Sequence, residues 1–155
     1  MFRALLHGAA AGAAGTTALD GVTYLDMALR GRPPSETPQK AVDKITAEIG
    51  LPVPGDADTR DNRRAGLGSL TGIATGVGIG VLAGLLRPAL LRLPSPLGVL
   101  LIGGGAMLAS DLPLARLGVT DPATWSPADW LSDAVPHLAY GAVTYATLAA
   151  TRDSG

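Results

Sequence analysis

Four side chains that can move a proton or bind a polar ligand lie inside long, otherwise apolar stretches of the chain. They are Asp20, Asp111, His137 and Tyr140. An ionisable group inside an apolar membrane helix is costly, so each such residue is a candidate for function. Carboxyl and imidazole groups together are suited to a proton relay or to binding a polar solute. We therefore treat these four as binding or proton-relay candidates.

The expected spans place the four candidates at one depth. Asp20 lies past the middle of a span at 4–28, and Asp111 lies at a similar point in a span at 96–115. These two spans run in the same direction, and a helix rises about 1.5 Å per residue. A span at 134–151 starts on the same side with His137 and Tyr140. The sequence thus predicts one polar cluster near the two long connections.

Each candidate also has a structural alternative. Asp20 is explained equally by hydrogen bonds from neighbouring Thr or Tyr side chains, and Asp111 by hydration near the membrane surface beside Pro113. Asp133 is most simply the N-cap of the last span. His137 lies one turn after Asp133, so the pair could bind a metal or pass a proton, and the structural alternative is an interfacial His hydrogen-bonded to the Asp. The residue types permit a metal, but their spacing requires none, so we expect no metal and no cofactor.

The remaining expected span, 66–86, contains no charged residue and has a glycine at every fourth position. The five glycines are Gly68, Gly72, Gly76, Gly80 and Gly84. Each would cost about 1 kcal/mol in an exposed helix of a soluble protein. In a bilayer the same spacing forms a groove in which another helix packs closely. We interpret these glycines as helix-packing residues, with a pore lining as the alternative.

Shorter elements connect the spans. Thr37 and Pro38 begin an amphipathic surface helix at 38–49, which is followed by a polar loop at 52–66. Trp125 and Trp130 belong to a short interfacial helix near 123–131, because Trp is enriched at headgroup depth. Arg3 before a run of small residues also fits a signal peptide, but the apolar segment continues for the length of a span, which favours a retained helix.

Composition narrows the class of protein. The 155 residues are 47% hydrophobic and 16% charged, with no Cys and a net charge of −1. The absence of Cys excludes disulfides and thiolate sites. No basic face with aromatic residues is present, so nucleic acid is not an expected partner. No phosphate-binding loop, HExxH or GxSxG motif occurs, so no catalytic residue is assigned and an enzyme is disfavoured.

Positive charges indicate an orientation. The connection 30–65 contains seven Lys and Arg residues and the segment 116–133 contains one, Arg116. The opposite side has four: Arg3, Arg87, Arg92 and Arg152. The excess predicts that the connection 30–65 is cytoplasmic.

Several segments also resemble a known group of proteins. The segments GAAAGAAGTTALD, RPPSETPQKAVDKI and DPATW, together with DWLSDAVPHLAYGAVT, resemble small four-helix membrane proteins of actinobacteria. HLAYG is similar to the last helix of YagU-like inner-membrane proteins. The resemblance implies a multi-pass protein of the bacterial cytoplasmic membrane and provides no activity or site residue.

We therefore predict an all-α integral membrane four-helix bundle in a single domain, 1–155, with a surface helix. The expected function is a scaffold or accessory subunit that packs through glycine-rich helices. Its partners would be the lipid bilayer and either another membrane protein or a second copy of the chain. The alternative is a small transporter or channel, linked to protons, that uses the Asp and His residues inside the spans.

Overall fold

The computed structural model describes residues 1–151, and every regular element in that range is a helix. The predicted all-α class is therefore confirmed. The elements in chain order are α1 (Phe2–Arg30), α2 (Thr37–Glu48), α3 (Ala57–Leu85), α4 (Arg87–Leu90), α5 (Ser95–Arg116), η1 (Pro122–Thr124) and α6 (Pro127–Ala150).

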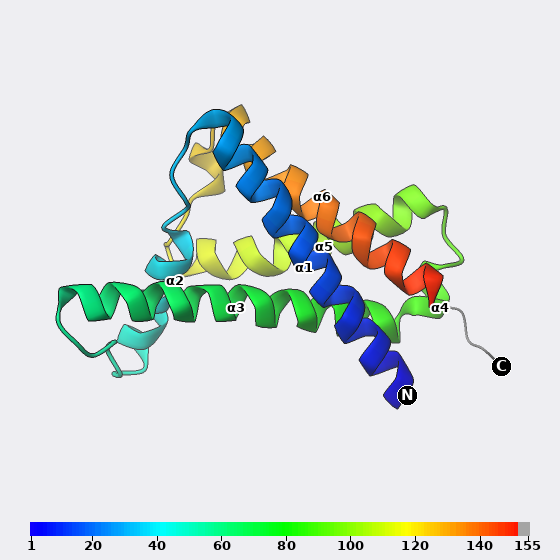
Figure 1. Ribbon diagram of the computed structural model, residues 1–155, viewed down its shortest axis with the longest axis horizontal. Coiled ribbons are helices and arrows are strands. Elements are labelled where there is room, and N and C mark those ends of the chain that lie inside the picture. Colours follow the sequence, from blue (N-terminus) through cyan, green and yellow to red (C-terminus); the bar gives the residue numbers. More distant parts are fainter. Residues whose placement is uncertain (152–155) are drawn as a thin grey trace.

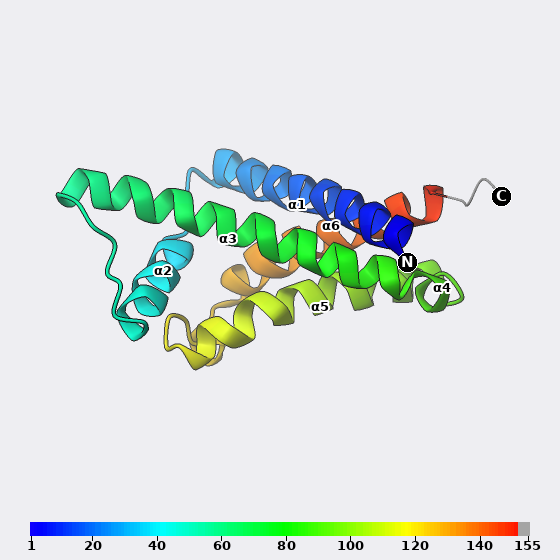
Figure 2. The same cartoon turned by 90° about the horizontal axis from the view of Figure 1, so that it is seen from below.

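Helix α1 holds the molecule together, because it packs against both α3 and α6. Helix α5 packs on α6, and α2 packs on α3. The start of α1 and the end of α6 lie near α4 at one end of the molecule, whereas α2 lies toward the other end (Figures 1 and 2). Arg152, which enters the charge count above, lies outside the described residues.

Glycine allows the backbones of α1 and α3 to touch. A Cβ atom built on Gly8 would lie 2.6 Å from the carbonyl oxygen of Gly80, and one on Gly12 would lie 2.9 Å from the Cα of Gly80. A Cβ atom on Gly84 would lie 2.7 Å from the Cα of Gly8. Real Cβ atoms essentially never approach other atoms this closely. The crossing therefore exists only because these positions have no side chain.

The rest of the glycine series contacts other parts of the same chain. Gly76 faces the hydroxyl of Thr16, and Gly68 faces Pro38 at the start of α2. Only Gly72 has no neighbour within 4 Å of its Cβ position. The α5–α6 crossing uses the same device, since a Cβ on Gly103 would lie 2.6 Å from the carbonyl oxygen of His137.

Helices α3 and α5 are long and apolar enough to cross a membrane. Only 11% of the most apolar window of α3 and 22% of that of α5 are buried inside the molecule. Their large apolar side chains instead point outward, as at Leu70, Ile73, Leu82, Leu100, Leu101 and Leu108. Within residues 1–151, the other two expected spans, in α1 and α6, do not meet the same standard of length and apolar composition.

The prediction of a polar loop at 52–66 is wrong from Ala57 onward, where the chain is helical. Helix α3 begins at Ala57, and the Asp56 side chain caps it by accepting a hydrogen bond from the Thr59 amide at 2.8 Å. The hydrogen bonds from Thr59 lower the pKa of the Asp56 carboxyl. Arg64 then pairs with Asp61 and with Asp43 of α2, so polar residues extend the apolar helix by about two turns. The surface helix predicted at 38–49 is present as α2.

The start of the last helix also differs from the prediction. Asp133 is not an N-cap, because α6 begins at Pro127 and Ser126 caps it. Ser126 and Asp129 form a reciprocal capping box, and hydrogen bonds from Ser126 lower the pKa of the Asp129 carboxyl. The expected helix 123–131 is divided between η1 and α6, and the rings of Trp125 and Trp130 meet edge-on at 4.9 Å. Asp133 is consequently one of the residues inside α6.

The close α1–α3 crossing gives a direct test. We expect Gly80→Leu to destabilise the protein by at least about 3 kcal/mol, because backbone atoms of α1 cannot move aside as a flexible side chain would. Gly78→Leu is the matched control, since Gly78 has nothing within 4 Å of its Cβ position. Thermal unfolding in a mild detergent measures both. Equal stability of the two variants would contradict the packing described above.

Candidate functional site

A cavity of about 690 Å³ lies at the end of the molecule where α2 packs. Helices α1, α2, α3, α5 and α6 all contribute to its wall. Its polar lining includes hydroxyls of α3 and a group of ionisable side chains from α5 and α6. These polar residues are Thr71, Thr75, Ser110, Asp111, Asp133 and His137.

Asp133 fixes the orientation of the His137 ring. The Nδ1 atom of His137 lies 2.8 Å from the backbone oxygen of Asp133 and 3.3 Å from its Oδ1 atom. A carbonyl oxygen only accepts hydrogen bonds, so Nδ1 carries the proton and Nε2 retains a lone pair in the neutral ring. Within residues 1–151 Nε2 has no hydrogen-bond partner. His137 is 9% exposed and lines the cavity, and its Nε2 atom keeps an unused lone pair.

The carboxyl groups of Asp111 and Asp133 meet across the α5–α6 contact. Both residues line the cavity from the packed helices α5 and α6, and Asp111 is near enough to Asp133 and His137 to interact with them by charge. The Oδ2 atom of Asp133 is buried and has no hydrogen-bond partner in the described part of the chain. Two ionised carboxylates at this separation repel each other. The contact is favourable only when a proton or a cation lies between the two groups.

Of the four predicted candidates, Asp111 and His137 come together, and Asp20 stays apart. Asp20 is half-buried, is not part of the cavity wall, and makes no hydrogen bond or ion pair with the described residues. Leu19, Thr23 and Arg30, spaced by four and seven residues, are the part of α1 that lines the cavity. Consecutive residues of a helix are turned by about 100° around its axis, so the Asp20 side chain points away from the cavity that Leu19 lines.

Tyr140 lies outside the cavity wall and belongs to the helix crossing instead. Its side chain is 1% exposed, and its hydroxyl donates a hydrogen bond to the carbonyl oxygen of Gly76 at 2.6 Å. A Cβ on Gly15 of α1 would lie 2.8 Å from the Tyr140 ring. Tyr140 therefore joins α6 to both α1 and α3.

Asp133 lines the cavity but is not one of the four candidates from the sequence. It was interpreted as an N-cap, yet the preceding Ser126-Pro127-x-Asp129 pattern is the stronger start signal, because Ser followed three residues later by an acid makes a capping box. Once Ser126 caps the helix, Asp133 falls at i−4 from His137 on one helical face. The spacing of four residues between Asp133 and His137 is the sequence feature that places both on one side of the helix.

The two arginines that line the cavity are held by neighbouring side chains. Arg32 Nε pairs with the Asp26 carboxylate at 2.5 Å, and Arg30 Nη1 donates to the Ser132 hydroxyl at 3.0 Å. Arg30 also lies 3.6 Å from Asp26. Two carboxylates, Asp26 on α1 and Asp129 on α6, interact with these two positive charges, so the arginines do not neutralise the acidic pair of α5 and α6.

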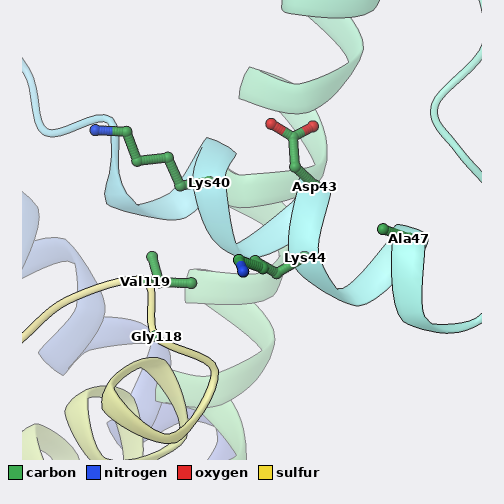
Figure 3. Close-up of a pocket in the computed structure, with 6 residues that line it drawn as sticks. All are labelled: Lys40, Asp43, Lys44, Ala47, Gly118 and Val119. Carbon is green, nitrogen blue, oxygen red and sulfur yellow. The ribbon is translucent and has the colours of Figure 1, made fainter.

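A second hollow of about 400 Å³ lies between α2 and the turn after α5, beside Gly118 and Val119. Lys40, Asp43 and Lys44 extend from α2 in different directions there (Figure 3). Lys40 pairs with Glu36 at 3.1 Å, and Asp43 pairs with Arg64. Only Lys44 lacks an ion-pair partner within residues 1–151, which is too little to define an anion site.

Comparison with known proteins adds no assignment. No family model, no curated protein and no solved structure matches the chain. Within residues 1–151 no three His, Asp or Glu side chains are grouped so that they could hold a metal ion. The candidate site therefore rests on the Asp111, Asp133 and His137 side chains in the larger cavity.

The position of Tyr140 predicts what its hydroxyl contributes. We expect Tyr140→Phe to lower the free energy of unfolding by about 1 kcal/mol, because it removes one buried hydrogen bond to Gly76. The cavity residues stay in place, so binding or transport through the cavity should be unchanged. Chemical unfolding in detergent and a flux assay measure the two effects. Loss of flux with unchanged stability would instead make Tyr140 a relay residue.

Proposed function

We propose that this chain is a multi-pass protein of the bacterial cytoplasmic membrane in which α1, α3, α5 and α6 form four spans. The outward-facing leucines of α3 and α5 support this proposal, because a core helix of a soluble protein would bury them. The glycine-based crossings support it as well, since membrane helices associate by close backbone packing. The likeness to four-helix actinobacterial and YagU-like proteins gives the same assignment.

We propose proton-linked transport of a small solute as the function of this bundle. The observation that carries the proposal is the grouping of Asp111, Asp133 and His137 on a cavity of about 690 Å³. Membrane helices retain ionisable groups where they bind ions or relay protons. Asp111 and Asp133 would hold one proton between them, and the free Nε2 atom of His137 would exchange it with water in the cavity.

The scaffold function receives less support from the glycine contacts. Four of the five glycines in the α3 series already face other parts of this chain, and Gly72 alone is open. These glycines thus allow α1 and α2 to pack against α3 within the same chain. We therefore propose that the glycine series stabilises the helices that surround the cavity.

Two aspartates on different sides of the bundle provide the test. In proteoliposomes with a pH-sensitive dye inside, we expect the wild-type chain to pass protons when a pH gradient and its solute are present. Asp111→Asn should reduce this flux by at least about a hundredfold, the low end for losing a positioned proton-transfer group. Asp20→Asn is the matched control and should keep the flux, because Asp20 does not line the cavity.

Two results would contradict the proposal. One is the absence of proton flux in the wild-type chain under any gradient or solute tested. The other is an equal loss of flux in Asp20→Asn and Asp111→Asn, which would mean that the cavity does not distinguish the two carboxyl groups.

A further inference from the structure

We propose that the solute is a small organic cation, a substituted ammonium with apolar groups, and that it competes with a proton for the Asp111–Asp133 pair. This inference rests on the proposed transport function and specifies its solute. It follows from the charge, the wall chemistry and the size of the cavity.

The charged groups around the cavity favour a cation. Helix α5 contributes Asp111, and α6 contributes Asp133, His137 and Asp129, the last of which is bound to Ser126. Helix α1 contributes Arg30 and the connection after it contributes Arg32; Asp26 pairs with both, and Asp129 interacts with Arg30 by charge. The lining residues of α2 and α3 carry no charge. The acidic pair therefore has no basic partner of its own other than a protonated His137, and the buried Oδ2 of Asp133 lacks a donor within the described chain.

The wall of the cavity favours an organic cation over a metal ion. Ca²⁺ takes six to eight oxygen ligands, and Mg²⁺ demands an octahedral set, whereas only two carboxyl groups meet here. Much of the remaining wall is apolar and can cover hydrocarbon groups, and the ring of Trp125 can face a cation. The apolar and aromatic lining residues are Leu19, Val42, Ile45, Pro113, Leu114, Leu117, Trp125 and Pro136.

The size of the cavity agrees with such a molecule. A volume of about 690 Å³ falls in the range of about 300–1,000 Å³ that is usual for small-molecule sites. Thr71 donates its hydroxyl proton to the Leu67 carbonyl, so its oxygen remains available as an acceptor. An ammonium group with N–H bonds could use that acceptor while its charge lies at the carboxyl pair.

Competition with a proton follows from the carboxyl contact. The pair is stable with one proton between its members, and a bound cation satisfies the same requirement without the proton. Binding of a cation should therefore release a proton. By linkage, acidification should weaken cation binding, approaching about tenfold per pH unit once the free site is protonated.

Titration calorimetry on the purified full-length chain tests this inference. The probe is benzyltriethylammonium, titrated at pH 8 and at pH 5.5 in a neutral detergent, in two buffers of different ionisation heat. We expect binding at pH 8, binding weaker by about fivefold or more at pH 5.5, and release of close to one proton per cation at pH 5.5, where the free site is protonated. Benzenesulfonate, an anion of similar aromatic part, should not bind.

Variants sharpen the test. Asp111→Asn should lose cation binding by at least about tenfold, and Asp20→Asn should bind as the wild-type chain does. If Asp111→Asn does not fold, proton release and pH dependence in the wild-type chain still decide the matter. Binding of benzenesulfonate equal to that of the cation, or cation binding without proton release, would overturn the inference.

The outcome also separates this inference from the proposed function. Proton flux in proteoliposomes without cation binding would overturn the solute assignment and leave proton transport standing. Cation binding with proton release but no flux would overturn transport and leave the binding site standing. Absence of both would reject both.

Discussion

The contact of bare backbone between α1 and α3 determines the rest of the structure. Gly8 and Gly12 of α1 meet Gly80 and Gly84 of α3 with no side chain between them. Because α1 also packs on α6, this contact sets where α6 lies, and Tyr140 then fixes α6 to Gly76 of α3. Gly103 and Gly141 repeat the device between α5 and α6. Four long helices are thus held by glycine contacts more than by a large apolar core, whose fully buried side chains are few.

The cavity follows from the same geometry. From their close crossing, α1 and α3 diverge toward the end where α2 packs (Figure 1). The space between the diverging helices is partly filled by α2 and is lined by polar residues of α5 and α6. Asp111, Asp133 and His137 therefore lie where the helices separate. Tight packing at one end permits a polar hollow at the other.

The sequence was sufficient for the features that depend on residue type and regular spacing. The all-helical class, the helix now seen as α2, and the presence of Asp111 and His137 on one cavity all follow from such patterns. Features that depend on helix rotation were not predictable. Asp20 does not line the cavity, because its side chain lies on another side of α1. The position of a residue along a helix does not fix the direction of its side chain around the helix axis.

Two further differences came from competing local signals. The acidic and basic residues of 57–65 were interpreted as a loop, although the Asp56 cap and the Arg64 ion pairs stabilise helix there. Asp133 was assigned to a cap that Ser126 provides. In both cases polar residues lie inside a helix, where composition favours a loop or a helix cap. Their hydrogen-bond and ion-pair partners, which the sequence does not show, determine which structure forms.

Solvent access along α3 tests most directly the claim that a water-filled cavity lies inside a lipid-facing bundle. The chain has no Cys, so single cysteines can be introduced at Thr75, which lines the cavity, and at Ile73, which is 49% exposed on the outer face. A charged, water-soluble maleimide applied to native membranes should label Thr75→Cys and leave Ile73→Cys unlabelled. Equal labelling of both would place α3 in water, and protection of Thr75→Cys would deny the cavity; either result would contradict the account.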